Sequence, residues 1–115
     1  MKFYIISDTH FGHDKIINWC QRPQNHEDLM IQSMAKISHQ DCLIHLGDFC
    51  IGDDLKWHKK LEYVSCRRIL VLGNHDSKSY SWYMNNGWHF ACDSLKIQYA
   101  GYNVCLSHKP QSVGS

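Results

Sequence analysis

The stretch Leu70-Val71-Leu72-Gly73-Asn74-His75-Asp76 decides the fold, because an apolar run ends there in a glycine and three polar side chains follow at once. Three other apolar runs end in the same way, at Asp8-Thr9-His10, at Gly47-Asp48 and at Ser107-His108. Short apolar runs with β-branched residues are typical of strands that are buried on both faces. Ligands of open α/β sheets bind beyond the carboxyl ends of the strands, so we expect the four polar segments to form one shared site.

The size and composition predict one small globular domain over residues 1–115. Hydrophobic residues make up 43% of the chain and charged residues 20%, and the net charge is +1. That charge gives no bulk electrostatic reason to expect a nucleic acid or an anionic membrane as a partner. No apolar run approaches the roughly 20 residues that span a bilayer, and no signal peptide is visible. We therefore expect a cytoplasmic protein.

The six cysteines have no C-x-x-C spacing, and several lie inside apolar runs. Without a secretory signal, they are expected to be reduced and to pack as small hydrophobic residues, neither paired in disulfides nor holding a zinc knuckle. The nine histidines are an unusual number for this length. Only their positions can separate metal ligands from packing residues, and His45, inside an apolar run, is expected to be a core histidine.

The hydrophobic periodicity predicts an α/β part that is followed by an antiparallel part. Apolar runs predict strands over 2–7, 41–46 and 69–72, and the 3.6-residue period predicts helices over 14–20, 27–39, 54–65 and 79–85. Leu29, Met30, Met34 and Ile37 would face inward from the second helix, and Leu55, Leu61 and Val64 from the third. Alternation over 95–99 and 102–106, around Ala100-Gly101, predicts a hairpin with one solvated face.

The polar residues at the strand ends form a set that suits divalent transition metals. Asp8 and His10 can turn a carboxylate and an imidazole toward one cation, and Asp48 can bridge two cations through its two oxygens. Asn74 adds a neutral oxygen and His108 a nitrogen. This mixed set suits Mn, Fe, Zn or Ni better than calcium or a thiolate zinc site. Two such ions, roughly 3.5–4 Å apart, would generate a bridging hydroxide and clamp a phosphoryl group.

The same motifs, in this order, resemble those of the calcineurin-like metallophosphoesterases from residue 5 to residue 108. They are Asp8-x-His10, Gly47-Asp48, Gly73-Asn74-His75-Asp76 and Ser107-His108. The opening segment 7–13, with Arg22-Pro23 after it, is most similar to the small bacterial and phage-encoded branch of the family. The resemblance implies an α/β fold of the metallophosphoesterase type, which is a β-sandwich flanked by helices.

The resemblance also implies two divalent metal cofactors, with manganese expected first and iron, zinc or nickel as alternatives. Asp8 and His10 would hold the first ion, Asp48 would bridge the two, and Asn74 and His108 would hold the second. Each of these residues also has a purely structural interpretation, since an aspartate such as Asp48 commonly ends a strand in a turn or caps a helix.

The implied activity is the hydrolysis of a phosphomonoester or phosphodiester by a metal-bridging hydroxide. His75 matches the catalytic histidine of the family, which steadies the transition state and protonates the leaving oxygen. Asp76 would orient His75 by accepting a hydrogen bond. The expected partner is a phosphate-ester substrate, either a small molecule or a nucleotide, and a nuclease acting on short stretches of nucleic acid stays open.

One departure from the family pattern keeps three alternatives open. The family continues past the Ser-His motif to a Gly-His-x-His segment, which residues 109–115 do not contain. We therefore expect a domain that is incomplete at its C-terminus relative to the family, with His13 as the nearest spare imidazole. The alternatives are a catalytically impaired remnant that binds metal or a partner, an interaction module with structural histidines, and completion of the site by a dimer partner.

Overall fold

The computed structural model describes residues 1–12 and 26–108. Four parallel strands form the main sheet in the order β1-β2-β3-β4, namely β1 (Phe3–Ile6), β2 (Cys42–His45), β3 (Arg67–Val71) and β4 (Phe90–Cys92). In the register of the sheet, Ile6 lies opposite His45, and His45 lies opposite Leu70. The carboxyl ends of the first three strands therefore meet at one end of the sheet.

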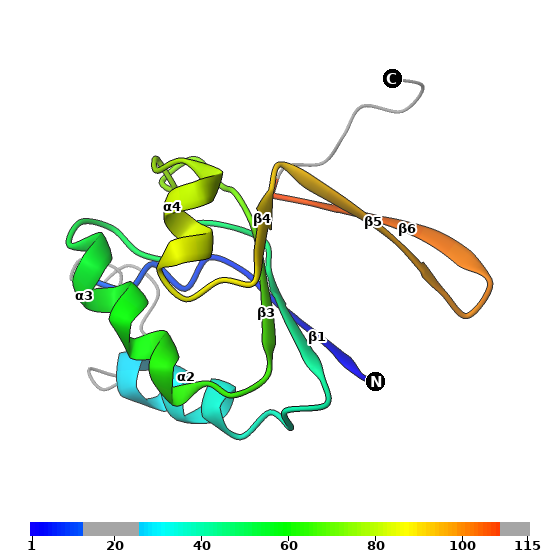
Figure 1. The fold of residues 1–115 in the computed structure, drawn as a ribbon, viewed down its shortest axis with the longest axis horizontal. Coiled ribbons are helices and arrows are strands. Elements are labelled where there is room, and N and C mark those ends of the chain that lie inside the picture. Colours follow the sequence, from blue (N-terminus) through cyan, green and yellow to red (C-terminus); the bar gives the residue numbers. More distant parts are fainter. Residues whose placement is uncertain (13–25, 109–115) are drawn as a thin grey trace.

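Helices and a hairpin cover opposite faces of this sheet. Figure 1 shows α2 (His26–Ala35), α3 (Asp54–Lys59) and α4 (Tyr80–Asn85) on one side, and the hairpin of β5 (Ser94–Tyr99) and β6 (Tyr102–Ser107) on the other. A short 3₁₀ turn, Lys60–Tyr63, follows α3. One hydrophobic cluster fills the space between the sheet and the helices, and a smaller one lies between the sheet and the hairpin. This is the predicted α/β fold with a second, antiparallel layer.

Strand β2 is buried on both faces, as its apolar sequence predicts. Successive side chains of a strand point to opposite faces. Leu43 belongs to the helix-side cluster, whereas Cys42 and Ile44 belong to the hairpin-side cluster. The ring of His45 packs on the helix side, against Phe49. The prediction of a core histidine at position 45 is thus confirmed.

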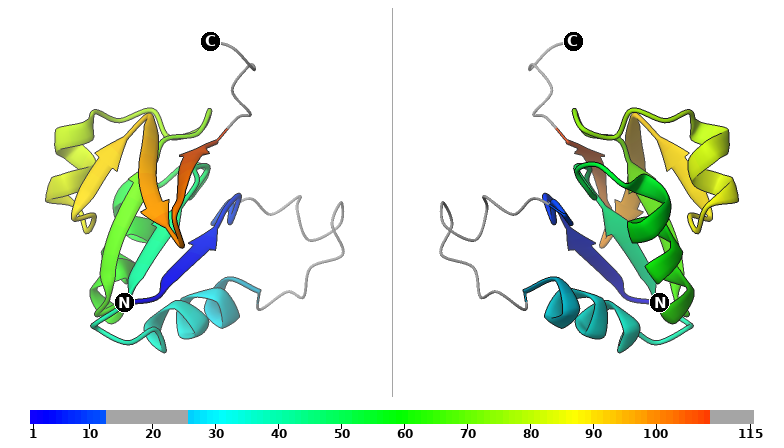
Figure 2. Two further views of the ribbon diagram at one scale, coloured as in Figure 1. Left: turned by 90° about the vertical axis from the view of Figure 1, so that its right-hand side faces the viewer. Right: turned by 90° about the vertical axis from the view of Figure 1, so that its left-hand side faces the viewer.

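Strand β1 contradicts the prediction of burial on both faces. Its side chains Tyr4 and Ile5 are 40% and 48% exposed. The reason is its place in the sheet, since β1 lies at one edge, as Figure 2 shows, and β2 is its single partner among the described strands. Among the residues that the structure describes, the helices and the hairpin therefore leave these two side chains partly exposed.

The remaining predicted elements are confirmed with local differences. The predicted helix 54–65 changes to 3₁₀ geometry after Lys59, and the predicted hairpin over 95–99 and 102–106 is formed by β5 and β6. Strand β4 was not predicted. The predicted helix 14–20 lies outside the described residues, as do His13 and Arg22. Within the described ranges, no helix has the length and apolar character that crossing a bilayer requires.

The inward faces of two helices differ from the prediction. Leu55 is 66% exposed, whereas Leu61 and Val64 are buried as predicted, and the buried side chains of α3 itself are Trp57 and His58. Trp57 presents more apolar surface than Leu55 and lies four residues before Leu61, so these two side chains share one face of the helix. On α2, Leu29 is exposed and Met34 is buried.

Candidate metal centre

Backbone hydrogen bonds carry the parallel pairing of β1 and β2 into the loops that follow them. The Asp8 N–H donates to the Gly47 carbonyl, and the His10 N–H donates to the Asp48 carbonyl, both at 3.0 Å. Phe11 continues the pattern with a 3.0 Å bond to the Phe49 carbonyl. These bonds hold the two loops side by side, so that residues 38 or 39 positions apart in the sequence become neighbours.

Three residues of these loops have left-handed backbone conformations, although none of them is glycine. The φ angles are 54° at Asp8, 49° at His10 and 56° at Asp48. This conformation costs an L-residue roughly 1–2 kcal/mol. Such backbone strain persists where the surrounding structure enforces it, and it gathers at functional sites. Here it turns the side chains of successive motifs toward one point.

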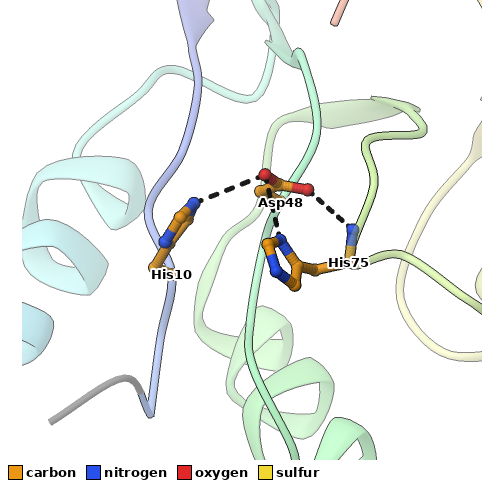
Figure 3. Close-up of side chains that lie close together, drawn as sticks. All are labelled: His10, Asp48 and His75. Carbon is orange, nitrogen blue, oxygen red and sulfur yellow. Dashed lines mark hydrogen bonds and ion pairs between the residues drawn. The ribbon is translucent and has the colours of Figure 1, made fainter. Parts of the chain in front are cut away.

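Three imidazole nitrogens surround one carboxylate oxygen of Asp48. The Oδ2 atom lies 3.4 Å from His10 Nε2, 3.2 Å from His75 Nδ1 and 3.4 Å from His108 Nε2. Figure 3 shows His10 and His75 on opposite sides of this carboxylate. The Asp8 carboxylate completes the group, with Oδ1 at 3.6 Å from His10 Nε2 and 3.9 Å from His108 Nδ1.

This geometry fits the donor set of a divalent metal. Protein nitrogens and oxygens bind zinc at about 2.0–2.2 Å, so two ligand atoms of one tetrahedral ion lie about 3.3–3.5 Å apart. The separations around Asp48 are of this size. The Nδ1–H of His108 donates to the Leu46 carbonyl at 2.7 Å, which leaves the Nε2 lone pair facing Asp48. A backbone carbonyl commonly orients metal-binding histidines in this way.

The electrostatic environment keeps Asp48 ionised. Burial by itself would raise the pKa of its carboxyl group. The backbone N–H of His75, which donates to Oδ1 at 2.9 Å, acts in the opposite direction, together with the rings of His75 and His108. The net effect is a pKa below the ordinary value. A buried, ionised carboxylate among imidazoles is suited to hold a cation.

Asp76 has other partners than the predicted one. Its Oδ2 accepts the N–H groups of Asp48 at 2.7 Å and of Gly73 at 2.8 Å, and its Oδ1 accepts that of Phe49 at 3.2 Å. The buried carboxylate therefore ties the loop after β2 to the loop after β3, where the resemblance implied a hydrogen bond with His75. Its role is to position the backbone that carries Asp48.

Two glycines let the same loops approach closely. A Cβ atom on Gly47, whose φ is +106°, would lie 2.5 Å from the Gly73 nitrogen. A Cβ atom on Gly73 would lie 2.5 Å from Asp48 Oδ1. Real Cβ atoms do not approach other atoms so closely, so these positions require glycine. The Gly47-Asp48 and Gly73-Asn74 motifs therefore have a packing reason as well as a chemical one.

A buried chain of hydrogen bonds joins the loops that follow β1 and β2. The Thr9 hydroxyl donates to the Phe49 carbonyl at 2.7 Å, and it therefore accepts from His45 Nε2 at 2.9 Å. His45 Nδ1 in turn accepts the Gly47 N–H at 3.0 Å. His45 is thus a neutral histidine that joins the loops after β1 and β2. Sequence reasoning placed it in the core but missed this connection.

The structure brings five of the six predicted site residues together, namely Asp8, His10, Asp48, His75 and His108. The sixth, Asn74, lies in the same loop between Gly73 and His75, and its side chain is exposed. Its role as a ligand stays a prediction. His108 comes from the hairpin layer, so three of the four converging segments follow strands of the parallel sheet and the fourth follows β6.

Comparison with known proteins identifies a family and similar proteins from two organisms. Residues 1–112 match the family model of the calcineurin-like phosphoesterases. The chain is 30% identical to the uncharacterized protein MJ1445 of Methanocaldococcus jannaschii over 96% of this chain and 60% of that protein. It is also similar to the crystal structure of AQ665, a protein of unknown function from Aquifex aeolicus, with a TM-score of 0.78 and 30% identity. That match covers 98% of this chain and 63% of AQ665, so the chain spans about three-fifths of both relatives.

Proposed function

Because the chain belongs to the calcineurin-like phosphoesterase family, we propose that it is a metal-dependent hydrolase of phosphomonoesters or phosphodiesters. The observation that carries the proposal is the convergence of two carboxylates and three imidazoles at separations of 3.2–3.9 Å. A purely structural cluster would have no reason to place three imidazole nitrogens around one buried carboxylate oxygen.

In the proposed site, two divalent ions are held by residues of four loops. Asp8 and His10 would hold one ion, Asn74 and His108 would hold the other, and Asp48 would contribute to both. When bound, such ions lower the pKa of water and neutralise charge on a phosphoryl group. Manganese is the ion that we expect first, with iron, zinc and nickel as alternatives that the same donors accept.

The protein's own acid in the reaction is His75. Its side chain is 50% exposed at the rim of the cluster, so its ring can reach a bound ester. We propose that a protonated ring nitrogen of His75 stabilises the developing charge and passes its proton to the leaving oxygen. The His75 ring also contacts Asp48, and this contact would keep the ring close to an ester bound at the cluster.

The substrate that fits this proposal is a small phosphate ester or a nucleotide. Specificity depends on the walls around a site, and the net charge of +1 provides little attraction for long nucleic acids. We also propose a reducing compartment such as the cytoplasm, which suits the free thiols of Cys42, Cys50, Cys66 and Cys92.

The test is the Mn²⁺-dependent hydrolysis of an aryl phosphodiester and an aryl phosphomonoester by the 115-residue chain and by Asp48→Asn. We expect turnover by the original chain and a loss of about 100-fold or more in the variant, equivalent to about 2.7 kcal/mol of transition-state stabilisation. The exposed Asp93→Asn serves as a control and should retain activity. A folded, metal-saturated chain without turnover would contradict the proposal and favour a catalytically impaired, metal-binding remnant.

A further inference from the structure

A second group of metal-binding side chains lies on the helix side of the sheet. The Cys50 thiol, an Asp54 carboxylate oxygen and a ring nitrogen of His58 all lie within 4.8 Å of one another. Cys50 follows Asp48 by two residues, and Asp54 and His58 are one turn apart on α3. The thiol of Cys50 donates to Asp54 Oδ1 at 3.2 Å. This group has a thiol ligand, which the Asp48 cluster lacks.

The hydrogen bonds of His58 fix which ring nitrogen is available to a cation. Nδ1 lies 2.8 Å from the Asp54 carbonyl oxygen, which can only accept, so Nδ1 carries the proton. Nε2 therefore carries a lone pair. The side chain is only 2% exposed, and Nε2 has no hydrogen-bond partner among the described residues. A buried acceptor without a donor is energetically unfavourable, so a ligand at Nε2 would remove a penalty.

The hydrogen bond from His58 Nδ1 to the Asp54 carbonyl is the kind of bond that orients a metal-binding histidine. Such histidines almost always donate their other ring N–H to a carbonyl or a carboxylate. Sulfur at about 2.3 Å and oxygen at about 2.0 Å from one tetrahedral ion are about 3.5 Å apart. The separation of 3.2 Å between Cys50 Sγ and Asp54 Oδ1 is close to that value.

We propose that Cys50, Asp54 and His58 form a second metal site that takes one zinc-class divalent cation. On binding, the S–H bond of Cys50 breaks, its proton leaves to solvent, and sulfur, carboxylate oxygen and Nε2 coordinate the ion. A water molecule fills the fourth position. The site links the loop that follows Asp48 to α3, so its role is to hold the backbone of the catalytic cluster. Its sequence signature is Cys-x₃-Asp-x₃-His, which differs from a C-x-x-C knuckle.

The thiolate ligand makes this site distinguishable from the catalytic cluster by spectroscopy. Co²⁺ bound by nitrogen and oxygen gives only weak visible bands, whereas a cobalt–thiolate bond adds an intense charge-transfer band in the near ultraviolet. We expect the Co²⁺-loaded chain to show that band, and Asp48→Asn to keep it. Cys50→Ser and Cys50→Ala should lose it, and His58→Gln should weaken Co²⁺ binding at this site by at least tenfold.

Two cysteine variants serve as controls for the assignment. Cys66→Ser removes a buried thiol outside the cluster, and Cys105→Ser removes an exposed one. Both should retain the band, and the circular dichroism spectrum of every variant must match that of the original chain. Absence of the band at saturating Co²⁺, or its persistence in both Cys50 variants, would overturn the proposal. Either result would leave the phosphoesterase proposal untouched, because that proposal is tested by turnover.

Discussion

At the scale of single residues, the carboxylate of Asp76 connects the two loops on which the candidate metal centre depends. Replacing it in Asp76→Asn leaves one acceptor oxygen for three N–H groups. Hydrogen bonds to a charged group contribute about 1.5–3 kcal/mol each. We therefore expect the free energy of unfolding, measured in urea, to fall by at least that amount. Mn²⁺ affinity should fall as well, because the backbone of Asp48 loses its anchor.

The matched control for this variant is Asp93→Asn, which alters an exposed carboxylate that accepts a hydrogen bond from Tyr80. It should change stability by less than about 0.5 kcal/mol and leave Mn²⁺ affinity unchanged. If Asp76→Asn behaved like this control, the positioning role of Asp76 would be refuted.

The buried His45 predicts how stability changes with pH. Burial is the main cause that lowers its pKa to about 3, against an ordinary value of 6.5, and burial lowers the pKa of His58 as well. Between pH 6.5 and about 3 the unfolded chain therefore binds more protons than the folded chain. The stabilisation is complete above pH 6.5 and is lost as the pH falls, by up to about 1.4 kcal/mol per pH unit for each histidine.

Urea unfolding at a series of pH values from 7.5 to 4 measures this dependence. His45→Gln should be less stable at pH 7.5, but its stability should fall less steeply with acid, because one titrating group is gone. His39→Gln alters an exposed histidine and should keep the original slope. An unchanged slope in His45→Gln would show that His45 is not held neutral by burial.

At this scale the sequence predicts which side chains converge better than it predicts the hydrogen bonds that hold them. Asp8, His10, Asp48, His75 and His108 can be recognised because each follows an apolar run. The partners of Asp76 could not be recognised, since backbone N–H groups carry no sequence signal. Nor does the sequence reveal that His45 links Thr9 to Gly47, because that depends on the register between β1 and β2.

At the scale of elements, the loops after β2 and β3 act as one unit because two glycines bring them together. Gly47→Ala would add a Cβ atom 2.5 Å from the Gly73 nitrogen, at a left-handed backbone position. We expect destabilisation by more than about 2 kcal/mol in urea unfolding, from strain and overlap combined. Mn²⁺ binding should weaken in parallel, since the overlap also separates Asp48 from the His75 loop.

Gly101→Ala isolates the backbone part of this effect. Gly101 also has a positive φ, but no atom of the described residues lies within 4 Å of an added Cβ atom. The Gly101→Ala substitution should lower the free energy of unfolding by only about 1–2 kcal/mol and leave the Mn²⁺ affinity unchanged. Equal effects of the two substitutions would mean that the close approach of the loops is unimportant for metal binding.

The elements themselves are predictable where hydrophobic periodicity is long, and less so where it is short. The three-residue strand β4 gives too few positions for a period, and its pairing with β3 is visible only in the folded sheet. The inward face of α3 was mispredicted for a related reason. Six helical residues offer two overlapping apolar faces, and the larger side chain, Trp57, decides between them.

At the scale of the whole molecule, the hairpin layer ties overall stability to the metal centre. Leu106 is buried between the hairpin and the sheet, two residues before His108. Leu106→Ala should cost about 2–4 kcal/mol in unfolding experiments and should also lower Mn²⁺ affinity, because it loosens the strand that delivers His108. Tyr102→Ala, at an exposed position of the same strand, should affect neither property. Loss of stability without loss of affinity would separate the hairpin from the site.

The overall architecture is the level at which the sequence is most informative, with one difference that matters for function. The α/β order and the antiparallel hairpin both follow from periodicity. The site, however, does not lie at the ends of four strands of one sheet. It lies between two layers, since β6 pairs only with β5 among the described strands. Packing between layers leaves no local pattern in the sequence. Before the fold is known, His108 can therefore be placed beside Asp48 only from the resemblance of the motifs to those of the family.

The bridging position of Asp48 is the central claim, and electron paramagnetic resonance of the Mn²⁺-loaded chain tests it most directly. Two ions that share the Asp48 carboxylate should give a multiline spectrum from coupled spins, with two Mn²⁺ bound per chain. Asp48→Asn should replace this spectrum with that of isolated Mn²⁺, and Asp93→Asn should leave it unchanged. A spectrum of isolated Mn²⁺ in the original chain at saturation would contradict the dinuclear site.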